Sequence, residues 1–460
     1  MNMSKNNSMQ IDGFYYDPVK KRHFRILEGD KYHPHLNNCS STPSIPSPRN
    51  VCSQLTRLNM LDSSGLNVQE CLLSGRFAQM KCEQSKQLEI YDYKGVQMKG
   101  ANCHYLIGEA STDSLFGVWN STDGNGSVIH HIKVSNFKDN PKCTIINAFP
   151  RGTKVEDLCM VQITDSPYSA VMCLTNHCKR DLSTFSSCNI QYIDNSDLTG
   201  ARRQVQDWSR NYEIREPSFS CCPYTHNTLA IGSENHIRLF TPNQPCNDHN
   251  QLVLKGKATS LVFSLDGKRL YSGTNYGHLI SFDVTSKKQI DDCDLKSKTI
   301  AYLYPLKNDN QLIVSCHDSK LFLTDRRNSK EPIFSFSNHV NDCKKIPISV
   351  DESVDVVCSS GQDYKIRFWS LRSGKLLHEI EPPSEQFKIN NNPSADSPTM
   401  VHSWYSNSWK SLNGQPLPMV FSCIKDTIKV HRQSSNEINN FHSGEIKNLN
   451  EENTSSSNDS

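Results

Sequence analysis

Four segments in the middle of this chain repeat one pattern: a β-type run, a short polar turn, and a second β-type run that ends in an aromatic residue or its equivalent. The equivalent end positions are Phe240, Phe282, Thr324 and Trp369, so the spacings are 42, 42 and 45 residues. A fifth copy at residues 421–431 follows a stretch rich in Pro, Ser and Asn at residues 381–398. This period is typical of a WD-repeat β-propeller. A single four-stranded blade cannot bury both of its faces, whereas a ring of packed blades can.

The repeats also suggest how many blades the propeller has. Residues 101–134 and 154–193 contain further β-type runs, which we interpret as two degenerate blades upstream of the five clearer copies. The sequence therefore predicts an all-β fold, a WD-repeat β-propeller of seven blades over residues 100–431, with about 47 residues per blade. Six or eight blades are alternatives. A pair of β-sandwiches is a weaker one, because it does not explain the period.

The two ends of the chain differ in composition from the middle. Apolar residues are only 36 % of the chain, and the ends are rich in Ser, Asn and Pro. Such segments bury too little apolar surface to offset the entropy of ordering them. We therefore expect a mostly disordered N-terminal region over residues 1–99, with a helix within about 51–85, and a disordered polar tail over residues 432–460. A short aromatic and basic motif at residues 13–27 predicts a hairpin, which either packs on the propeller or becomes ordered on docking.

Charge and hydropathy exclude several classes of protein. The net charge of +2 does not suggest direct nucleic-acid binding. The sequence contains no run of 18 apolar residues, so we expect no membrane span. The start of the chain, residues 1–10, has no apolar stretch typical of a secretory signal. We therefore expect the 18 cysteines to be free thiols of an intracellular protein, in the nucleus, the cytoplasm or both.

The sequence contains no motif for catalysis. It has no G-x-S-x-G, H-E-x-x-H, Walker A or G-x-G-x-x-G pattern. One group of soft ligands lacks the paired spacing of a zinc site, namely Cys173, His177, Cys178 and Cys188. Cysteines in such runs are usually small apolar residues of strands. We expect no catalytic residue, metal or cofactor.

Two adjacent repeats end in a four-residue pattern close to Trp-Asp-x-Arg. The first is Thr324-Asp325-Arg326-Arg327, which has Thr in place of Trp, and the second is Trp369-Ser370-Leu371-Arg372, which has Ser in place of Asp. An arginine two residues beyond a strand end projects at one rim of a propeller, where its planar fork can bind a partner's carboxylate or carbonyl groups. The sequence favours a compact docking patch here, although solvated arginines after strands are common. In WD repeats, residues placed like His339, Asp363 and Trp369 also belong to a buried hydrogen-bonded network.

The N-terminal motif carries a resemblance to a known family. Residues 13–27 read Gly-Phe-Tyr-Tyr-Asp-Pro-Val-Lys-Lys-Arg-His-Phe-Arg-Ile-Leu, followed by Gly29 and by Asn37-Asn38-Cys39. This stretch resembles the opening of the WD-repeat protein 21 family, also called cullin-4-associated factor 4. The resemblance implies a substrate receptor of cullin-4 RING ubiquitin ligases. Such receptors dock on an adaptor, damaged-DNA-binding protein 1, through Trp-Asp-x-Arg boxes and often a helical N-terminal segment.

Carried over residue by residue, the resemblance implies a set of adaptor-binding positions in the two boxes: Asp318, Asp325, Arg327, Asp363, Trp369 and Arg372. The partners it implies are the adaptor and an unknown protein substrate. The mechanism would be proximity, since a receptor raises the effective concentration of its substrate beside a separately supplied enzyme. Two alternatives stay open at this point. One is a WD-repeat scaffold of another complex, and the other is an enzyme with acid or base residues at the central channel.

Overall fold

The computed structural model describes residues 14–17, 22–25, 68–84, 101–109, 113–120, 126–135, 142–151, 153–161, 168–178, 184–194, 210–214, 216–224, 228–240, 251–308, 310–381, 402–406, 419–424 and 427–433. Most of residues 1–99 and 432–460, which we predicted to be largely disordered, lie outside these described residues, whereas residues 14–17, 22–25, 68–84 and 432–433 lie within them. The chain divides into two compact units, residues 1–65 and residues 66–460, and each is described by itself. Within the described part, no helix is both long enough and apolar enough to cross a membrane.

The first unit contains an antiparallel hairpin of β1 (Phe14–Asp17) and β2 (Arg22–Arg25). Its register runs from Phe14 opposite Arg25 to Asp17 opposite Arg22. The hairpin occupies the centre of the aromatic and basic motif at residues 13–27, and the Asp-Pro pair at the end of β1 suits the start of a turn.

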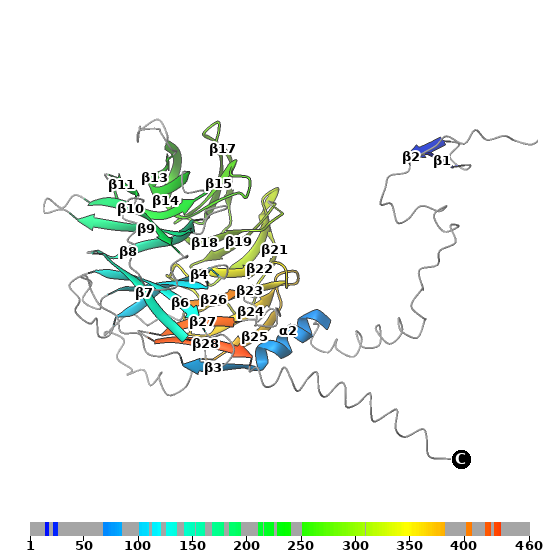
Figure 1. Ribbon diagram of the computed structural model, residues 1–460. Helices are drawn as coiled ribbons and strands as arrows, with labels where there is room; N and C mark the ends of the chain where they lie inside the picture. Colours follow the sequence, from blue (N-terminus) through cyan, green and yellow to red (C-terminus); the bar gives the residue numbers. More distant parts are fainter. Residues whose placement is uncertain are drawn as a thin grey trace, which may run out of the picture. The chain divides into compact units, whose positions relative to one another are not determined.

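The second unit is a β-propeller, with five sheets of four antiparallel strands as its blades (Figure 1). The first blade holds β4 (Asn102–Glu109), β5 (Ser114–Asn120), β6 (Ser127–Ser135) and β7 (Lys142–Arg151). The second holds β8 (Val155–Val161), β9 (Tyr168–Cys178), β10 (Thr184–Asp194) and β11 (Arg210–Ile214). Two later blades hold β18 (Ile300–Pro305), β19 (Gln311–Cys316), β20 (Leu321–Asp325) and β21 (Asn328–Ser335), then β22 (Ile348–Asp351), β23 (Val356–Ser360), β24 (Ile366–Ser370) and β25 (Leu376–Ile380).

The last blade closes the ring with a strand from the other end of the unit. Three of its strands are β26 (His402–Ser406), β27 (Met419–Ile424) and β28 (Thr427–Gln433). The fourth is β3 (Met80–Gln84), which pairs antiparallel with β28. β26 contacts both β22 and β4, so the final blade lies between its neighbours on either side. Because a ring leaves only short edges, this closure protects backbone groups that an open sheet would expose.

The predicted count of seven blades is wrong: the described residues form five four-stranded blades. The remaining strands form a single six-stranded sheet of β12 (Ser218–Pro223), β13 (Leu229–Phe240), β14 (Gln251–Phe263), β15 (Arg269–Thr274), β16 (His278–Asp283) and β17 (Lys288–Asp294). The first half of β13 pairs with β12 and its second half with β14, while β14 in turn continues to pair with β15. The long strands β13 and β14 therefore connect β12–β17 into one sheet, whereas the repeat spacing had suggested separate blades for these residues.

The repeat positions themselves lie at matching places in the strands. Phe282, Thr324 and Trp369 are each the next-to-last residue of β16, β20 and β24. Phe240 ends β13. All four are buried, because these strands have apolar neighbours on both faces. The WD-type propeller inferred from the period is confirmed.

One helix of the described residues packs against the propeller. α2 (Val68–Ala78) contacts β25, and its Phe77 stacks on Phe368 of β24 with ring centroids 4.2 Å apart. The helix begins before β3, so the segment that supplies the closing strand also covers β25.

Candidate functional site

The two arginines of the predicted docking patch lie at the same end of adjacent blades. β20 ends at Asp325 and β24 ends at Ser370, so each arginine follows its strand by two residues. The loops at this end contact each other, since the backbone N–H of Lys307 donates to Glu352 Oε1 at 2.9 Å. We call this surface the arginine rim and define it as residues 306–308, 325–327, 352–355 and 370–373.

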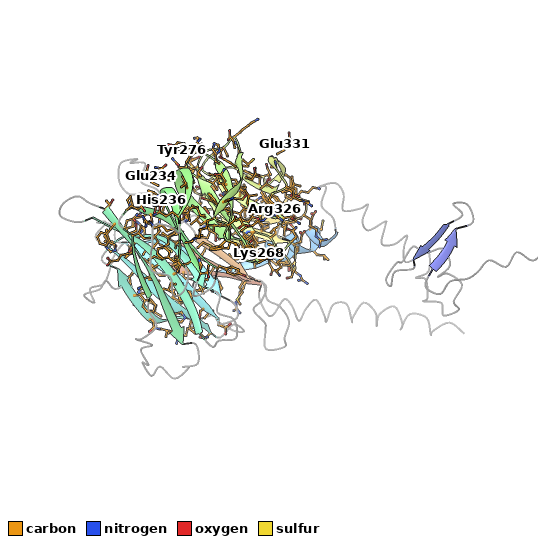
Figure 2. The ribbon with its side chains drawn as sticks, turned by 90° about the horizontal axis from the view of Figure 1, so that it is seen from above. Glu234, His236, Lys268, Tyr276, Arg326 and Glu331 are labelled. Carbon is orange, nitrogen blue, oxygen red and sulfur yellow. The ribbon has the colours of Figure 1, made fainter. Side chains whose placement is uncertain are left out.

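The neighbouring arginine in the first box is held by its own blade. Arg326, labelled in Figure 2, donates through Nε and Nη2 to the side-chain oxygen of Asn310 at 3.2 and 3.1 Å. Its backbone N–H also donates to the Asn310 carbonyl at 2.9 Å. Arg326 is therefore engaged within the protein, which leaves Arg327 as the exposed arginine of this box.

Arg327 is exposed and held by a carboxylate at the same time. Its Nε lies 2.9 Å from Asp325 Oδ1 and its Nη2 lies 2.6 Å from Asp325 Oδ2, and its backbone N–H donates to Oδ1 at 2.9 Å. The hydrogen bonds from Arg327 outweigh the opposing effect of burial and lower the pKa of Asp325, so the carboxylate stays charged. The Arg327 side chain remains 69 % exposed. A paired guanidinium still has free N–H groups for a partner.

The backbone of Arg372 is held in a similar way, but by a residue outside its own box, and its guanidinium lies farther from the carboxylate than that of Arg327. Its backbone N–H donates to Asp355 Oδ1 at 2.9 Å, and its Nε lies 3.6 Å from the same oxygen. Ser370, which stands where the box would have Asp, donates through Oγ to Asp355 Oδ2 at 2.8 Å. The Arg372 side chain is 76 % exposed, whereas that of Asp355 is 4 % exposed. Burial raises the pKa of Asp355, and the bonds from Ser370 and the Arg372 backbone oppose that rise.

The structure does not bring the two upstream aspartates to the arginine rim. Asp318 lies in the turn between β19 and β20, and Asp363 lies in the turn between β23 and β24. Antiparallel pairing puts these turns at the opposite ends of β20 and β24 from the arginines. A five-residue strand is about 16 Å long, so these aspartates and the arginines cannot form one compact patch.

Each upstream aspartate has partners of its own. Asp318 accepts bonds from Ser297 Oγ at 2.8 and 2.9 Å and pairs with Lys320 at 2.7 Å. Burial alone would raise the pKa of Asp318, but these hydrogen bonds outweigh it and the pKa is lowered. Asp363 pairs with Arg367, which also contacts Glu379 at 2.7 Å. Both aspartates therefore stabilise charged contacts between strands or loops of the propeller.

Trp369 belongs to the core. It is fully buried, and its Nε1 donates to the carbonyl of Ser337 at 2.8 Å. His339 lies beside it, with ring centroids 6.2 Å apart, but its Nε2 lies 3.4 Å from Ser315 Oγ. Since Asp363 bonds to Arg367, the three residues expected to share one network here bond to different partners.

Sequence reasoning missed Asp355. It lies in the turn between β22 and β23, in the stretch Asp351-Glu352-Ser353-Val354-Asp355, and has a positive φ of 65°. The only signal in the sequence is an acidic turn one hairpin before a box that lacks its own aspartate. Nothing in that pattern says which of its acidic residues reaches Arg372.

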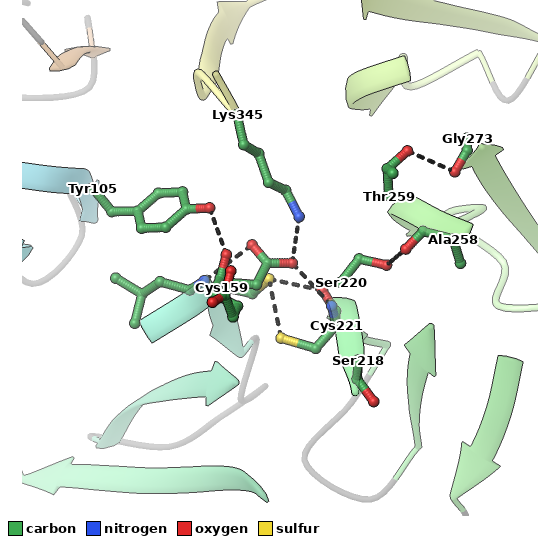
Figure 3. Close-up of polar contacts among 12 residues, drawn as sticks. Tyr105, Cys159, Ser218, Ser220, Cys221, Ala258, Thr259, Gly273 and Lys345 are labelled. Carbon is green, nitrogen blue, oxygen red and sulfur yellow. Dashed lines mark hydrogen bonds and ion pairs between the residues drawn. The ribbon is translucent and has the colours of Figure 1, made fainter. Parts of the chain in front are cut away.

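A second polar cluster lies where several sheets meet (Figure 3). Lys345 donates to Asp157 Oδ2 at 2.6 Å, and the same oxygen accepts the backbone N–H of Cys221 at 2.9 Å. The thiol sulfurs of Cys159 and Cys221 lie 4.0 Å apart. Ligand atoms of Asp157, Cys159 and Cys221 fall within 4.8 Å of one another, which a metal would require.

The charges of this cluster argue for a structural role. The hydrogen bond to Cys221 and burial raise the pKa of the Cys159 thiol well above its ordinary value, so it stays protonated. Burial would lower the pKa of Lys345, but Asp157 outweighs it and the pKa is raised, so the ammonium persists. An ammonium that already neutralises the carboxylate repels a metal cation. The arrangement is a buried ion pair joining β8 to the segment before β22.

The geometry defines a class of protein: a WD-type β-propeller with two exposed, carboxylate-held arginines on adjacent blades. Comparison with known proteins narrows this class. The family model described as "DDB1- and CUL4-associated factor 4 beta-propeller domain" matches residues 74–401. The chain belongs to this family.

The curated relatives agree with that assignment. The chain is 22 % identical to DDB1- and CUL4-associated factor 4 of Bos taurus over 433 residues, which cover 85 % of this chain and 82 % of the relative. It is 21 % identical to the Homo sapiens protein of the same name, over 86 % of this chain and 82 % of the relative. It is 22 % identical to DDB1- and CUL4-associated factor 4-like protein 2 of Homo sapiens, over 67 % of this chain and 78 % of the relative. The family inferred from residues 13–27 is confirmed.

Proposed function

We propose that this chain is a substrate receptor of a cullin-4 RING ubiquitin ligase and docks on the adaptor, damaged-DNA-binding protein 1 (DDB1), through the arginine rim. The observation that carries the proposal is the pair Arg327 and Arg372. Each follows a strand of an adjacent blade by two residues, each is exposed, and each is held by a carboxylate. Membership of the DDB1- and CUL4-associated factor 4 family supports the choice of partner.

The held arginines suit docking for a physical reason. A long side chain loses rotamer freedom when it binds, which costs about 0.5–1.5 kcal/mol for each side chain. At Arg327, a carboxylate that already orients the guanidinium reduces this cost before the partner arrives. The remaining N–H groups can then donate to carboxylate or carbonyl oxygens of the adaptor.

The role that follows is presentation of a substrate, without catalysis by this chain. A receptor bound to the ligase by one surface and to a substrate by another raises the local concentration of substrate lysines beside the conjugating enzyme. We further propose that the complex acts inside the cell, in the nucleus, the cytoplasm or both.

Co-purification of purified full-length chain with purified DDB1 on a sizing column tests the proposal. Wild type is expected to form a complex, and the double variant Arg327→Ala, Arg372→Ala is expected to lose it while keeping its circular dichroism spectrum. Lys255→Ala serves as a control, because Lys255 is an exposed cation within β14, away from the arginine rim. A wild-type chain that forms no complex would contradict the proposal and favour a WD-repeat scaffold of another assembly.

A further inference from the structure

The second box lacks an aspartate in its strand, yet the backbone N–H of its arginine donates to a carboxylate, as that of the first box does. In the first box, the backbone N–H of Arg327 donates to Asp325 Oδ1 at 2.9 Å, and the guanidinium contacts the same carboxylate. In the second box, the backbone N–H of Arg372 donates to Asp355 Oδ1 at 2.9 Å, and Nε of Arg372 is the guanidinium atom nearest that carboxylate. The two carboxylates thus accept the same backbone hydrogen bond from different places in the chain. Each also pairs with the guanidinium, through hydrogen bonds in the first box and at 3.6 Å in the second.

We propose that Asp355 replaces the missing strand aspartate as the positioning residue for Arg372 in adaptor docking. This inference rests on the proposed function. It assigns a role to a residue that lies outside both boxes and outside the family's motif.

Ser370 makes the replacement sterically and chemically consistent. Ser370 is fully buried, and its Oγ donates to Asp355 Oδ2 at 2.8 Å. A second carboxylate at position 370 would face Asp355 at close range, and like charges that close are unfavourable in a buried place. A hydroxyl instead donates a hydrogen bond and fixes the carboxylate. The change from Asp to Ser in the box and the presence of Asp355 therefore belong together.

The backbone at Asp355 also points to a built feature. Its φ of 65° lies in the left-handed region, which Asp and Asn adopt more readily than most residues. The carbonyl of Asp355 accepts the backbone N–H of Leu371 at 3.1 Å, so the turn is tied to the end of β24 on both its main chain and its side chain. The carboxylate reaches Arg372 because this turn holds it there.

A chain of hydrogen bonds connects the same loop to α2. Glu70 Oε1 accepts from Ser373 Oγ at 2.7 Å, and the Ser373 backbone N–H donates to Ser370 Oγ at 3.3 Å. Since Ser370 Oγ donates to Asp355, the loop that carries Arg372 is fixed between the β22–β23 turn and the helix. This linkage reduces the number of conformations open to the Arg372 backbone.

A double-mutant cycle on affinity for purified DDB1 tests the inference with the full-length chain. Arg372→Ala is expected to weaken binding about 10- to 100-fold, and Asp355→Asn about 10-fold. Asn keeps the shape of Asp355 and tolerates its positive φ, so folding is preserved. The combination of Asp355→Asn with Arg372→Ala is expected to bind no more weakly than Arg372→Ala alone. Asp355→Asn combined with Arg327→Ala is expected to give the product of the two single effects.

The pattern of the cycle separates the two claims. Suppose that wild type binds DDB1 but the effects of Asp355→Asn and Arg372→Ala on affinity multiply, or that Asp355→Asn leaves the affinity unchanged. The role proposed for Asp355 is then wrong, and the proposed function stands. If wild type does not bind DDB1, the proposed function fails and the role of Asp355 fails with it. Should Asp355→Asn lower the thermal midpoint to the assay temperature, Ser370→Ala replaces it. That variant removes one hydrogen bond to the Asp355 carboxylate and is expected to weaken binding to DDB1 a few-fold. Combined with Arg372→Ala, it is expected to weaken binding no further than Arg372→Ala alone.

Discussion

Trp369 and Arg372 belong to the same four-residue segment, yet their surroundings are opposite. Trp369 is fully buried among residues of two blades, including Leu321 and Val357, whereas Arg372 is 76 % exposed. The first therefore acts through the stability of the fold, and the second is available to a partner.

Replacing each of these residues separates the two roles. Trp369→Ala is expected to lower the free energy of unfolding by about 3–5 kcal/mol, since it removes a large buried ring and its bond to Ser337. Arg372→Ala is expected to change it by less than about 1 kcal/mol, because the guanidinium is exposed and approaches Asp355 no nearer than 3.6 Å. Urea unfolding followed by far-UV circular dichroism, which reports on the backbone, measures the free energy of unfolding of both variants. Similar losses for the two variants would show that Arg372 is also structural.

A second prediction concerns Asp363, at the end of β24 away from the arginine rim. Its partner Arg367 has a side chain only 5 % exposed, so removing the charge of Asp363 leaves a buried guanidinium with Glu379 as its remaining carboxylate. Asp363→Asn is expected to lower the free energy of unfolding by about 1–3 kcal/mol. Its affinity for DDB1 at a temperature where it is folded is expected to equal that of wild type. If the folded variant bound DDB1 ten times more weakly than wild type, Asp363 would belong to the docking surface and this prediction would be wrong.

At this scale the sequence predicted part of the site. The spacing after the repeat positions correctly put Arg327 and Arg372 at one end of adjacent blades, because strand ends follow from the period. The sequence did not show that Asp318 and Asp363 lie far from these arginines. In each box a strand separates the aspartate from the arginine and puts them at opposite ends of the blade. The spacing also missed Asp355, which reaches Arg372 only through the pairing of β23 with β24.

Among the elements, β3 closes the last blade. It is the outer strand of the last blade, pairing with β28 over residues 80–84. Removing it would expose the backbone groups of β28, and an exposed edge favours association between molecules.

Two truncations test the importance of this closing strand. Deletion of residues 1–65 removes only the first compact unit and is expected to leave the thermal midpoint unchanged. Deletion of residues 1–85 also removes α2 and β3 and is expected to lower the midpoint strongly and to cause aggregation, as seen by light scattering. Equal midpoints for the two truncations would show that the blade closes without β3.

The sequence predicted these elements unevenly. The period located β16, β20 and β24, because each repeat ends in a large apolar residue or its equivalent. The joining of β12–β17 into one sheet was not predictable in the same way. Ser233-Glu234-Asn235 resembles the turns of the other repeats, and Asn235 has a φ of 65°, yet β13 continues through it as a strand with a register shift.

At the scale of the whole molecule, the four histidines whose pKa is lowered most among the described residues link stability to pH. Burial lowers the pKa of His130, His131, His339 and His431 from 6.5 to about 4. In the unfolded chain these groups titrate near 6.5, so the unfolded state binds more protons between pH 6.5 and 4. Stability is therefore fully present above pH 6.5 and falls as the pH is lowered towards 4.

The size of this effect makes it measurable. Each histidine is expected to contribute a loss on the order of 2 kcal/mol between pH 7 and pH 5. Urea midpoints at pH 7.5 and pH 5 are expected to differ clearly. The variant His431→Gln, in which a non-titrating side chain replaces one that hydrogen-bonds to Ser422, is expected to show a smaller difference. A midpoint that does not fall on acidification would contradict the neutral state of these histidines.

Hydrogen–deuterium exchange of the full-length chain, alone and with purified DDB1, tests the central claim most directly, because it reports where the adaptor binds. The account predicts slower exchange on complex formation at residues 325–327 and 371–374, and unchanged exchange in the turns at residues 317–320 and 361–365. Protection confined to those turns, or no protection anywhere at the arginine rim of a chain that binds DDB1, would contradict docking through Arg327 and Arg372.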